Sequence, residues 1–329
     1  MLFQNAKHPL EMKVTHLNKV KAQRKQQLQL QMVDDKGLTS LISRAFTDLT
    51  KKDNTKKTSK FGLFKNKTTN KNCFVLDFHG DIKATEVQQL REEISTLLTV
   101  AQAEDEVIVR LESSGGMVHA YGLAAAQLAR IKEAGLHLTV CIDKVAASGG
   151  YMMACVADKI LAAPFAVVGS IGVVAQVPNF HDLLEKHDID VEVFTAGKYK
   201  RTVTVFGENT EEDKQKFQQE LEETHKLFKD FVRKYRPNLD VEQVATGEHW
   251  YGEDAITRNL VDALQTSDSY IIEKMTDSEL YAIQSRQKPS IAQKLGISQA
   301  AQAVVATAID KLPDALAKLE SAKMQMVKK

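Results

Sequence analysis

Short apolar runs alternate with longer amphipathic runs between residues 73 and 195, and this alternation constrains the fold most strongly. Residues 73–78 and 106–111 have the length and apolar character of buried strands, and a helical pattern over 117–134 ends at Gly135. Further strands are predicted near residues 137–143, 159–163, 167–175 and 190–195. Such repetition is typical of a largely parallel sheet or of stacked ββα units, with ligand groups at the carboxyl ends of the strands. The predicted fold class is therefore α/β.

Two glycine turns follow predicted strand ends and are expected to face one crevice. They are Ser113-Ser114-Gly115-Gly116 and Ser148-Gly149-Gly150. A serine at a helix N-terminus lies beside free backbone N–H groups, which is where acyl-transfer enzymes place a nucleophile. Ser148 is therefore the first candidate for chemistry, although such residues also form ordinary tight turns.

Texture and composition divide the chain into four segments. With 329 residues, of which 43% are hydrophobic, it is long enough for one large α/β domain with extensions. We expect a helical extension over 1–49, a lysine-rich linker over 50–72, the main domain over 73–267 and a helical tail over 268–329. The linker fits either a solvated spacer or a basic strip lying on anionic lipid.

Several classes of function find no signal in the sequence. A net charge of +1 gives no indication of nucleic-acid binding. Cys73, Cys141 and Cys155 lie in apolar runs without metal-ligand or redox spacing, so buried free thiols are predicted, with no disulfide, metal or cofactor. The most apolar stretch, residues 160–174, is too short for a bilayer, and the first 20 residues lack the apolar region of a signal peptide. As written, the chain is expected to be soluble.

A nucleophilic serine needs a base, and the residues alone leave several candidates open. His119 follows the first glycine turn, and His181 and His187 flank a short helical pattern. Lys198 and Lys200 follow the strand predicted near 190–195. A lysine acts as a base only if burial lowers its pKa from the usual value near 10.4. Ser170, in the turn Gly169-Ser170-Ile171-Gly172, could then orient the neutral amine.

The Ser148 turn, the Ser170 turn and the Lys200 run together resemble the signal peptide peptidase A (S49) family of Ser/Lys serine peptidases, in particular its SohB branch. The similarity extends over roughly residues 73–267. The segments that carry it are 111–119, 143–155, 196–201, 207–211 and 245–252. Family members usually have proline where this chain has Ser114, but both following glycines are present.

The resemblance implies a Clp protease/crotonase-like spiral of ββα units and a Ser/Lys dyad that hydrolyses peptide bonds without a cofactor. Ser148 matches the nucleophile, Lys200 the general base, and Ser170 the hydroxyl that holds the base. Gly115 and Gly149 match the backbone donors of the oxyanion hole.

The substrate is expected to be a peptide in extended conformation. The edge at Gly116 and Met117 would let such a peptide add as a strand, and small residues near Ser148 favour small or apolar side chains at the cleavage site. Tyr151 is assigned to the substrate-binding group, although such side chains are also common in cores. The resemblance implies membrane-associated or signal-peptide-derived substrates.

The resemblance further implies homo-oligomeric rings or domes, with the dyad completed across protomers. It places the catalytic domain in the periplasm, at the bacterial inner (cytoplasmic) membrane. Members of the SohB branch begin with a membrane-spanning segment, and no such run occurs in this chain. Two alternatives remain: a crotonase-like acyl-CoA enzyme, whose Gly115 and Gly149 would hold a thioester oxyanion, and a catalytically silent membrane scaffold.

Overall fold

The computed structural model describes residues 10–32 and 71–287. Of these, residues 12–32 and 71–285 belong to one compact unit, and the other unit is described only at residues 10–11 and 286–287. Most of the predicted linker over 50–72 and most of the predicted tail over 268–329 lie outside the described residues.

The described helices and strands follow one another in the α/β order that the sequence predicts. In chain order they are β1 (Leu10–His16), α1 (Leu17–Gln31), β2 (Lys71–Gly80), α3 (Val87–Leu97), β3 (Glu106–Ser113), α4 (Val118–Glu133), β4 (His137–Ile142), β5 (Val145–Ala147), α5 (Gly149–Ala154), β6 (Lys159–Ala162), β7 (Val167–Gly169), α6 (His181–Glu185), α7 (Glu211–Tyr235), α8 (Val241–Val244), β8 (His249–Tyr251), α9 (Gly252–Thr257), β9 (Ala263–Leu264), α10 (Ser267–Lys274) and β10 (Ser278–Gln287).

Strands β10, β2, β3, β4, β6 and β9 pair in that order and run parallel, so their carboxyl ends meet at one edge. A branch leaves this sheet where β5 pairs with both β3 and β7, and β8 adds antiparallel to β7. Strands β4 and β5 follow one another along the chain and precede α5, in strand–strand–helix order. The predicted α/β class and its ββα units are therefore confirmed.

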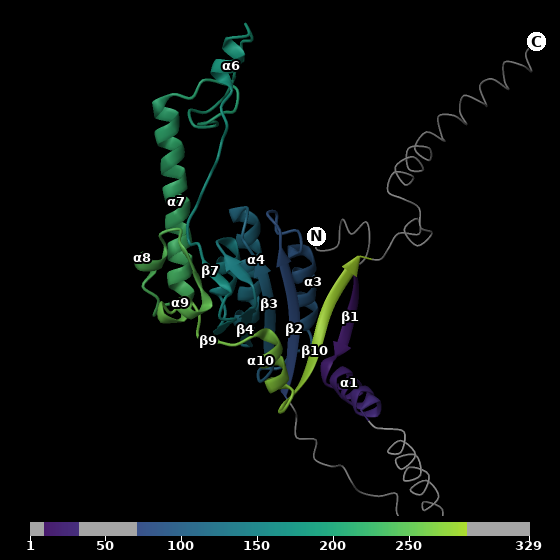
Figure 1. The fold of residues 1–329 in the computed structure, drawn as a ribbon. Coiled ribbons are helices and arrows are strands. Elements are labelled where there is room, and N and C mark those ends of the chain that lie inside the picture. The colour runs from purple at the N-terminus through teal and green to yellow at the C-terminus, as the bar shows by residue number, and fades with distance from the viewer. Residues whose placement is uncertain (1–9, 33–70, 288–329) are drawn as a thin grey trace, which may run out of the picture. The chain divides into compact units, whose positions relative to one another are not determined.

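Apolar side chains cover both faces of the main sheet. Helices α3 and α4 pack on one face, where Phe78, Leu90 and Leu128 join the larger core cluster (Figure 1). Helix α10 covers part of the other face through Tyr270 and Ile271. Each fully buried side chain of this size contributes about 1.5–3 kcal/mol of transfer free energy, so this packing fixes the strand ends that carry the site.

Three segments differ from the sequence-based expectation. Residues 190–195 are exposed and form no strand, because the structure gives them no pairing partner among the described residues. Residues 278–287, expected to be helical, form β10, because parallel pairing with β2 satisfies their backbone at long range. Among the described residues of the predicted N-terminal helical extension, residues 10–16 form strand β1 and residues 17–31 form helix α1.

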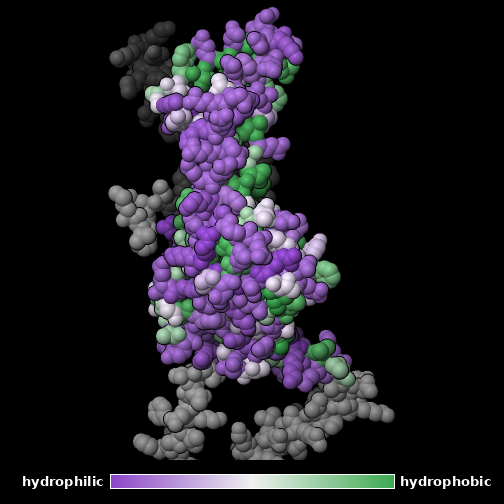
Figure 2. Space-filling view, turned by 90° about the vertical axis from the view of Figure 1, so that its left-hand side faces the viewer, coloured by the Kyte–Doolittle hydropathy of each residue, from purple (hydrophilic) through white to green (hydrophobic). Residues whose placement is uncertain are grey.

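Residues 173–210, here called the arm, connect β7 to α7 and carry α6 at their far end (Figure 1). Asn179 holds the arm together by donating to the carbonyl oxygens of Thr204 and Gly207, at 3.1 and 3.0 Å. A capping box between Thr210 and Asp213 starts α7. Apolar patches show among the polar surface of this region (Figure 2). The most exposed large apolar side chains there are Val174 and Phe194.

Candidate active site

Ser148 lies at a strained turn between strand β5 and helix α5. Its backbone has φ 53° and ψ −118°, a combination that a residue with a side chain rarely adopts. The turn is held from both sides, because the Ser148 N–H donates to the Gly169 carbonyl at 2.8 Å and Gly150 packs on the Ser113 backbone. Strain maintained in this way is typical of a functional side chain.

Ser170 lies beside Ser148 at the neighbouring strand end. Ala147 of β5 pairs in register with Gly169 of β7, and each serine follows its paired residue. Ser170 also has a positive φ, 52°, and its N–H donates to the Glu248 carbonyl at 2.6 Å. The structure therefore brings the two predicted serines together.

The two glycine turns meet at Gly115 and Gly149. A Cβ atom added to Gly115 would lie 2.7 Å from the Gly149 nitrogen and 2.8 Å from the Ser148 Cβ. Gly115 has φ 88°, a conformation that favours glycine. Gly149 is the first residue of α5, so its N–H has no partner within the helix. The Gly115 N–H donates to the Ser113 Oγ at 3.0 Å, so it must turn from Ser113 to serve a substrate.

A buried chain of hydrogen bonds anchors the turn that contains Gly115. Tyr121 donates its hydroxyl proton to the Asp81 carbonyl at 2.7 Å. That leaves Ser113 as the donor in its 2.5 Å bond to the Tyr121 hydroxyl, and the Ser113 Oγ in turn accepts from Gly115. Both side chains are buried. The chain of bonds fixes the Gly115 turn against the loop that follows β2.

Both serines open onto one cavity of about 680 Å³. Its walls are mainly small or apolar residues, and His225 is the only aromatic side chain among them. The lining residues are Ile82, Ser114, Gly115, Gly116, Val118, Ser148, Ser170, Gly172, Val173, Val174, His225, Thr246 and Gly247.

The residues predicted to bind substrate fall in different places. Gly116 lines the cavity, and its backbone lies so close to the Ile82 carbonyl that no side chain fits. The Met117 N–H donates to the same carbonyl at 2.8 Å, so it is not free to pair with a peptide. Tyr151 is fully buried, and its hydroxyl donates to the Leu260 carbonyl at 3.0 Å. Burial raises the pKa of Tyr151, whose side chain extends from α5 into the core.

The candidate bases named from the sequence do not line this cavity within one chain. Lys200 is exposed on the arm. Lys198 forms an ion pair with Glu212 at 2.9 Å, and the hydrogen bond to Glu212 raises the pKa of Lys198. Neither His119 nor the arm histidines His181 and His187 reach the cavity. The one histidine that does, His225, was missed because its helix carries no recognisable motif.

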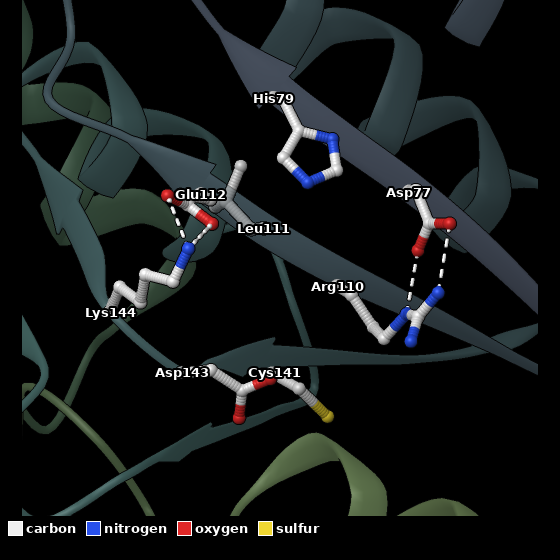
Figure 3. Close-up of a pocket in the computed structure, with 8 residues that line it drawn as sticks. All are labelled: Asp77, His79, Arg110, Leu111, Glu112, Cys141, Asp143 and Lys144. Atoms are coloured by element: carbon white, nitrogen blue, oxygen red, sulfur yellow. Dashed lines mark hydrogen bonds and ion pairs between the residues drawn. The ribbon is translucent and has the colours of Figure 1, made fainter.

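A second cleft, of about 170 Å³, lies where β2, β3 and β4 end (Figure 3). Arg110 and Lys144 are paired there: Arg110 binds both carboxylate oxygens of Asp77, at 2.6 and 2.9 Å, and Lys144 binds Glu112 at 3.0 Å. Asp143 accepts hydrogen bonds from the backbone N–H and the hydroxyl of Ser267. Burial raises the pKa of the Cys141 thiol to about 12, which keeps it protonated and unreactive. The Ser148 cavity is therefore the better candidate for chemistry.

The remaining sequence predictions concern thiols, metals and membranes. Cys73, Cys141 and Cys155 are free and buried, as predicted. A surface group of His181, Asp182 and Glu185 has metal-ligand atoms within 4.8 Å of one another, but the latter two side chains are exposed and nothing fixes a coordination geometry. In the described part of the chain, no helix combines the length and apolar character needed to cross a membrane.

Comparison with known proteins finds relatives among probable proteases. It is 65% identical over 223 residues to the probable protease SohB of Haemophilus influenzae, covering 68% of this chain and 63% of that protein. It is 58% identical over 218 residues to the probable protease SohB of Buchnera aphidicola, covering 66% of this chain and 65% of the relative. The chain thus spans slightly less than two thirds of the length of these relatives.

Among solved structures, a membrane-bound stomatin-specific protease in complex with a substrate peptide matches with a TM-score of 0.41 and 12% identity, covering 70% of this chain and 97% of that chain. The family descriptions match more extensively. Residues 2–128 match "Peptidase family S49 N-terminal" and residues 130–281 match "Peptidase family S49". Because these matches span nearly all of the described residues and the relatives agree with them, the chain belongs to peptidase family S49.

Proposed function

We propose that this chain is a serine endopeptidase in which Ser148 attacks the carbonyl carbon of a peptide bond. The observation that carries the proposal is that three features meet at one cavity. They are the strained backbone of Ser148, Ser170 at the end of the neighbouring paired strand, and the turns that contain Gly115 and Gly149. Membership of a peptidase family and the relatives named as probable proteases support the same activity.

The proposed mechanism uses Lys200 as the general base, with Ser170 orienting its amine. Neutral Lys200 accepts the Ser148 hydroxyl proton while Oγ bonds to the substrate carbon, and the N–H groups of Gly149 and Gly115 receive the developing oxyanion. The lysine ammonium then protonates the leaving amine as the C–N bond breaks. Water attacks the acyl-enzyme, gives its proton to Lys200 and releases the new carboxylate as Ser148 regains its proton.

Within one chain Lys200 stands on the exposed arm and does not line the cavity, so we propose that the dyad forms between copies of the chain. Two features support this assembly. The arm displays large apolar side chains to solvent, including Val174 and Phe194 at 91% and 88% exposure. A neighbour's cavity would also bury the Lys200 amine beside Ser170, as a neutral lysine base requires.

The proposed substrates are extended polypeptides with small or apolar residues at the cleavage site, derived from membrane-associated proteins or signal peptides. The preference for small or apolar substrate side chains follows from the glycine and valine residues that line the cavity. We further propose that the protein works at the bacterial inner membrane with its catalytic domain in the periplasm. The lysine-rich segment over 50–72 supplies a basic strip suited to anionic lipid.

Hydrolysis of an apolar, unstructured polypeptide by the full chain tests this function. The wild type should cleave it, and Ser148→Ala should lose activity by about 10³-fold or more while remaining folded. Because alanine keeps the Cβ atom, the substitution does not change the backbone strain at position 148. Equal activity in the two proteins would exclude Ser148 as the nucleophile.

A further inference from the structure

His225 occupies a position in the Ser148 cavity that the proposed mechanism does not use. It lies on α7, one turn before the buried Phe228 and two turns before the buried Val232, so all three share the face of the helix that packs inward. It lines the same cavity as Ser148 and Ser170.

The His225 imidazole has an unmet hydrogen-bonding requirement. Its Nε2 is buried from solvent and has no hydrogen-bond partner among the residues that the structure describes. A buried polar atom left in this state costs free energy, so its retention calls for an explanation such as a role in function. The hydroxyl groups of Ser148, Ser170 and Thr246 line the same cavity, but none of them bonds to Nε2.

From this we infer that His225 is a substrate-binding residue that hydrogen-bonds the bound peptide through Nε2. The inference rests on the proposed peptidase function and extends it to a specific contact. Because Nε2 is buried, the inference requires the ring to turn toward the cavity that His225 lines. A peptide supplies both main-chain donors and acceptors, so either neutral tautomer of His225 finds a partner. The contact binds substrate and does not act on Ser148.

Steady-state kinetics of His225→Leu and His225→Gln test this role, because the Gln side-chain amide can replace Nε2 and Leu cannot. We expect KM to rise about tenfold in His225→Leu with kcat within about threefold, and His225→Gln to recover most of the loss. Glu222→Gln, one turn earlier on α7 and outside the Ser148 cavity, should match the wild type.

Labelling of Ser148 by a small fluorophosphonate, which lacks the peptide, separates this contact from the function it depends on. All three variants should label at the wild-type rate, which also reports that each one is folded. If the wild type labels and His225→Leu has an unchanged KM, or if Leu and Gln behave alike, the substrate contact is wrong. If the wild type neither labels nor cleaves peptide, the proposed function itself fails.

Discussion

Ser148 and Ser170 are structural equivalents at the ends of two paired parallel strands. Each follows a residue of the Ala147–Gly169 pair, and their φ angles are 53° and 52°. The Ser148 N–H donates to the carbonyl of Gly169, the residue directly before Ser170. One serine can therefore serve as the nucleophile while the other orients a base that approaches from the shared cavity.

Gly115→Ala should abolish the oxyanion site. Its Cβ would lie 2.7 Å from the Gly149 nitrogen and 2.8 Å from the Ser148 Cβ, and alanine is strained at φ 88°. We expect kcat for peptide hydrolysis to fall by about 10²–10³, as for the loss of an oxyanion donor. Gly122→Ala on α4 is the control, because its Cβ meets nothing within 4 Å and alanine favours a helix by about 0.8–1 kcal/mol. Equal kcat in the two variants would contradict the site.

Tyr121→Phe should lower kcat more than it raises KM, because it removes the hydroxyl that holds Ser113 and, through it, the Gly115 turn. We expect a kcat about tenfold lower and a loss of about 1–3 kcal/mol in the free energy of unfolding. Tyr151→Phe removes an equally buried hydroxyl, bonded to the Leu260 carbonyl outside the cavity. It should lose stability and keep kcat. If both variants lose kcat alike, Tyr121 has no specific positioning role.

Mixed assemblies should reveal a dyad completed between copies. Ser148→Ala and Lys200→Ala are each expected to be inactive alone, because each lacks one member of the proposed dyad. Dissociating the two variants together and reassembling them should restore a fraction of wild-type peptide hydrolysis, since some interfaces regain both residues. Activity that stays at the level of the separate variants, in assemblies shown to contain both, would rule out a dyad across copies.

Glu106→Gln should destabilise the protein at neutral pH and much less in acid. Burial acts to raise the pKa of Glu106, but hydrogen bonds from Lys274, Thr139 and Tyr270 outweigh it and hold the pKa below its usual value of 4.5. The carboxylate therefore stabilises the fold above that value, and this contribution is lost as the pH falls through the folded-state pKa.

Denaturant unfolding from pH 7 to pH 3 measures this effect. The variant should be about 1–3 kcal/mol less stable at pH 7, and the difference from wild type should shrink as the pH falls. Glu112→Gln breaks the exposed pair with Lys144, so its effect should stay within about 1 kcal/mol throughout. A difference for Glu106→Gln that does not change with pH would contradict the assigned role of the carboxylate.

Local sequence patterns predict most of the central sheet and the meeting of its serine turns. Apolar runs such as 106–111 form strands because their side chains fill the core, and parallel strands bring their carboxyl ends together. Local patterns do not predict strand β10, because its pairing with β2 joins residues about 200 positions apart. Local patterns do not single out His225 either, because one histidine in a polar helix forms no motif. Only the folded chain places it at the cavity.

The proposed pairing of Lys200 with Ser148 follows neither from local sequence patterns nor from the structure of a single chain. Lys200 lies on an exposed segment with Gly197 and Tyr199. As the proposed base, it therefore has to meet Ser148 in an assembly of several copies. The division of the chain into four segments also remains a prediction, since the residues that would join the segments lie largely outside the described ranges.

Fluorophosphonate labelling followed by mass spectrometry tests the Ser148–Lys200 pair most directly. The full chain should carry the label on Ser148, Lys200→Ala should lose it, and Lys198→Ala should keep it because Lys198 already pairs with Glu212. A label on another residue, or labelling of Ser148 at the same rate without Lys200, would contradict the proposed Ser/Lys peptidase.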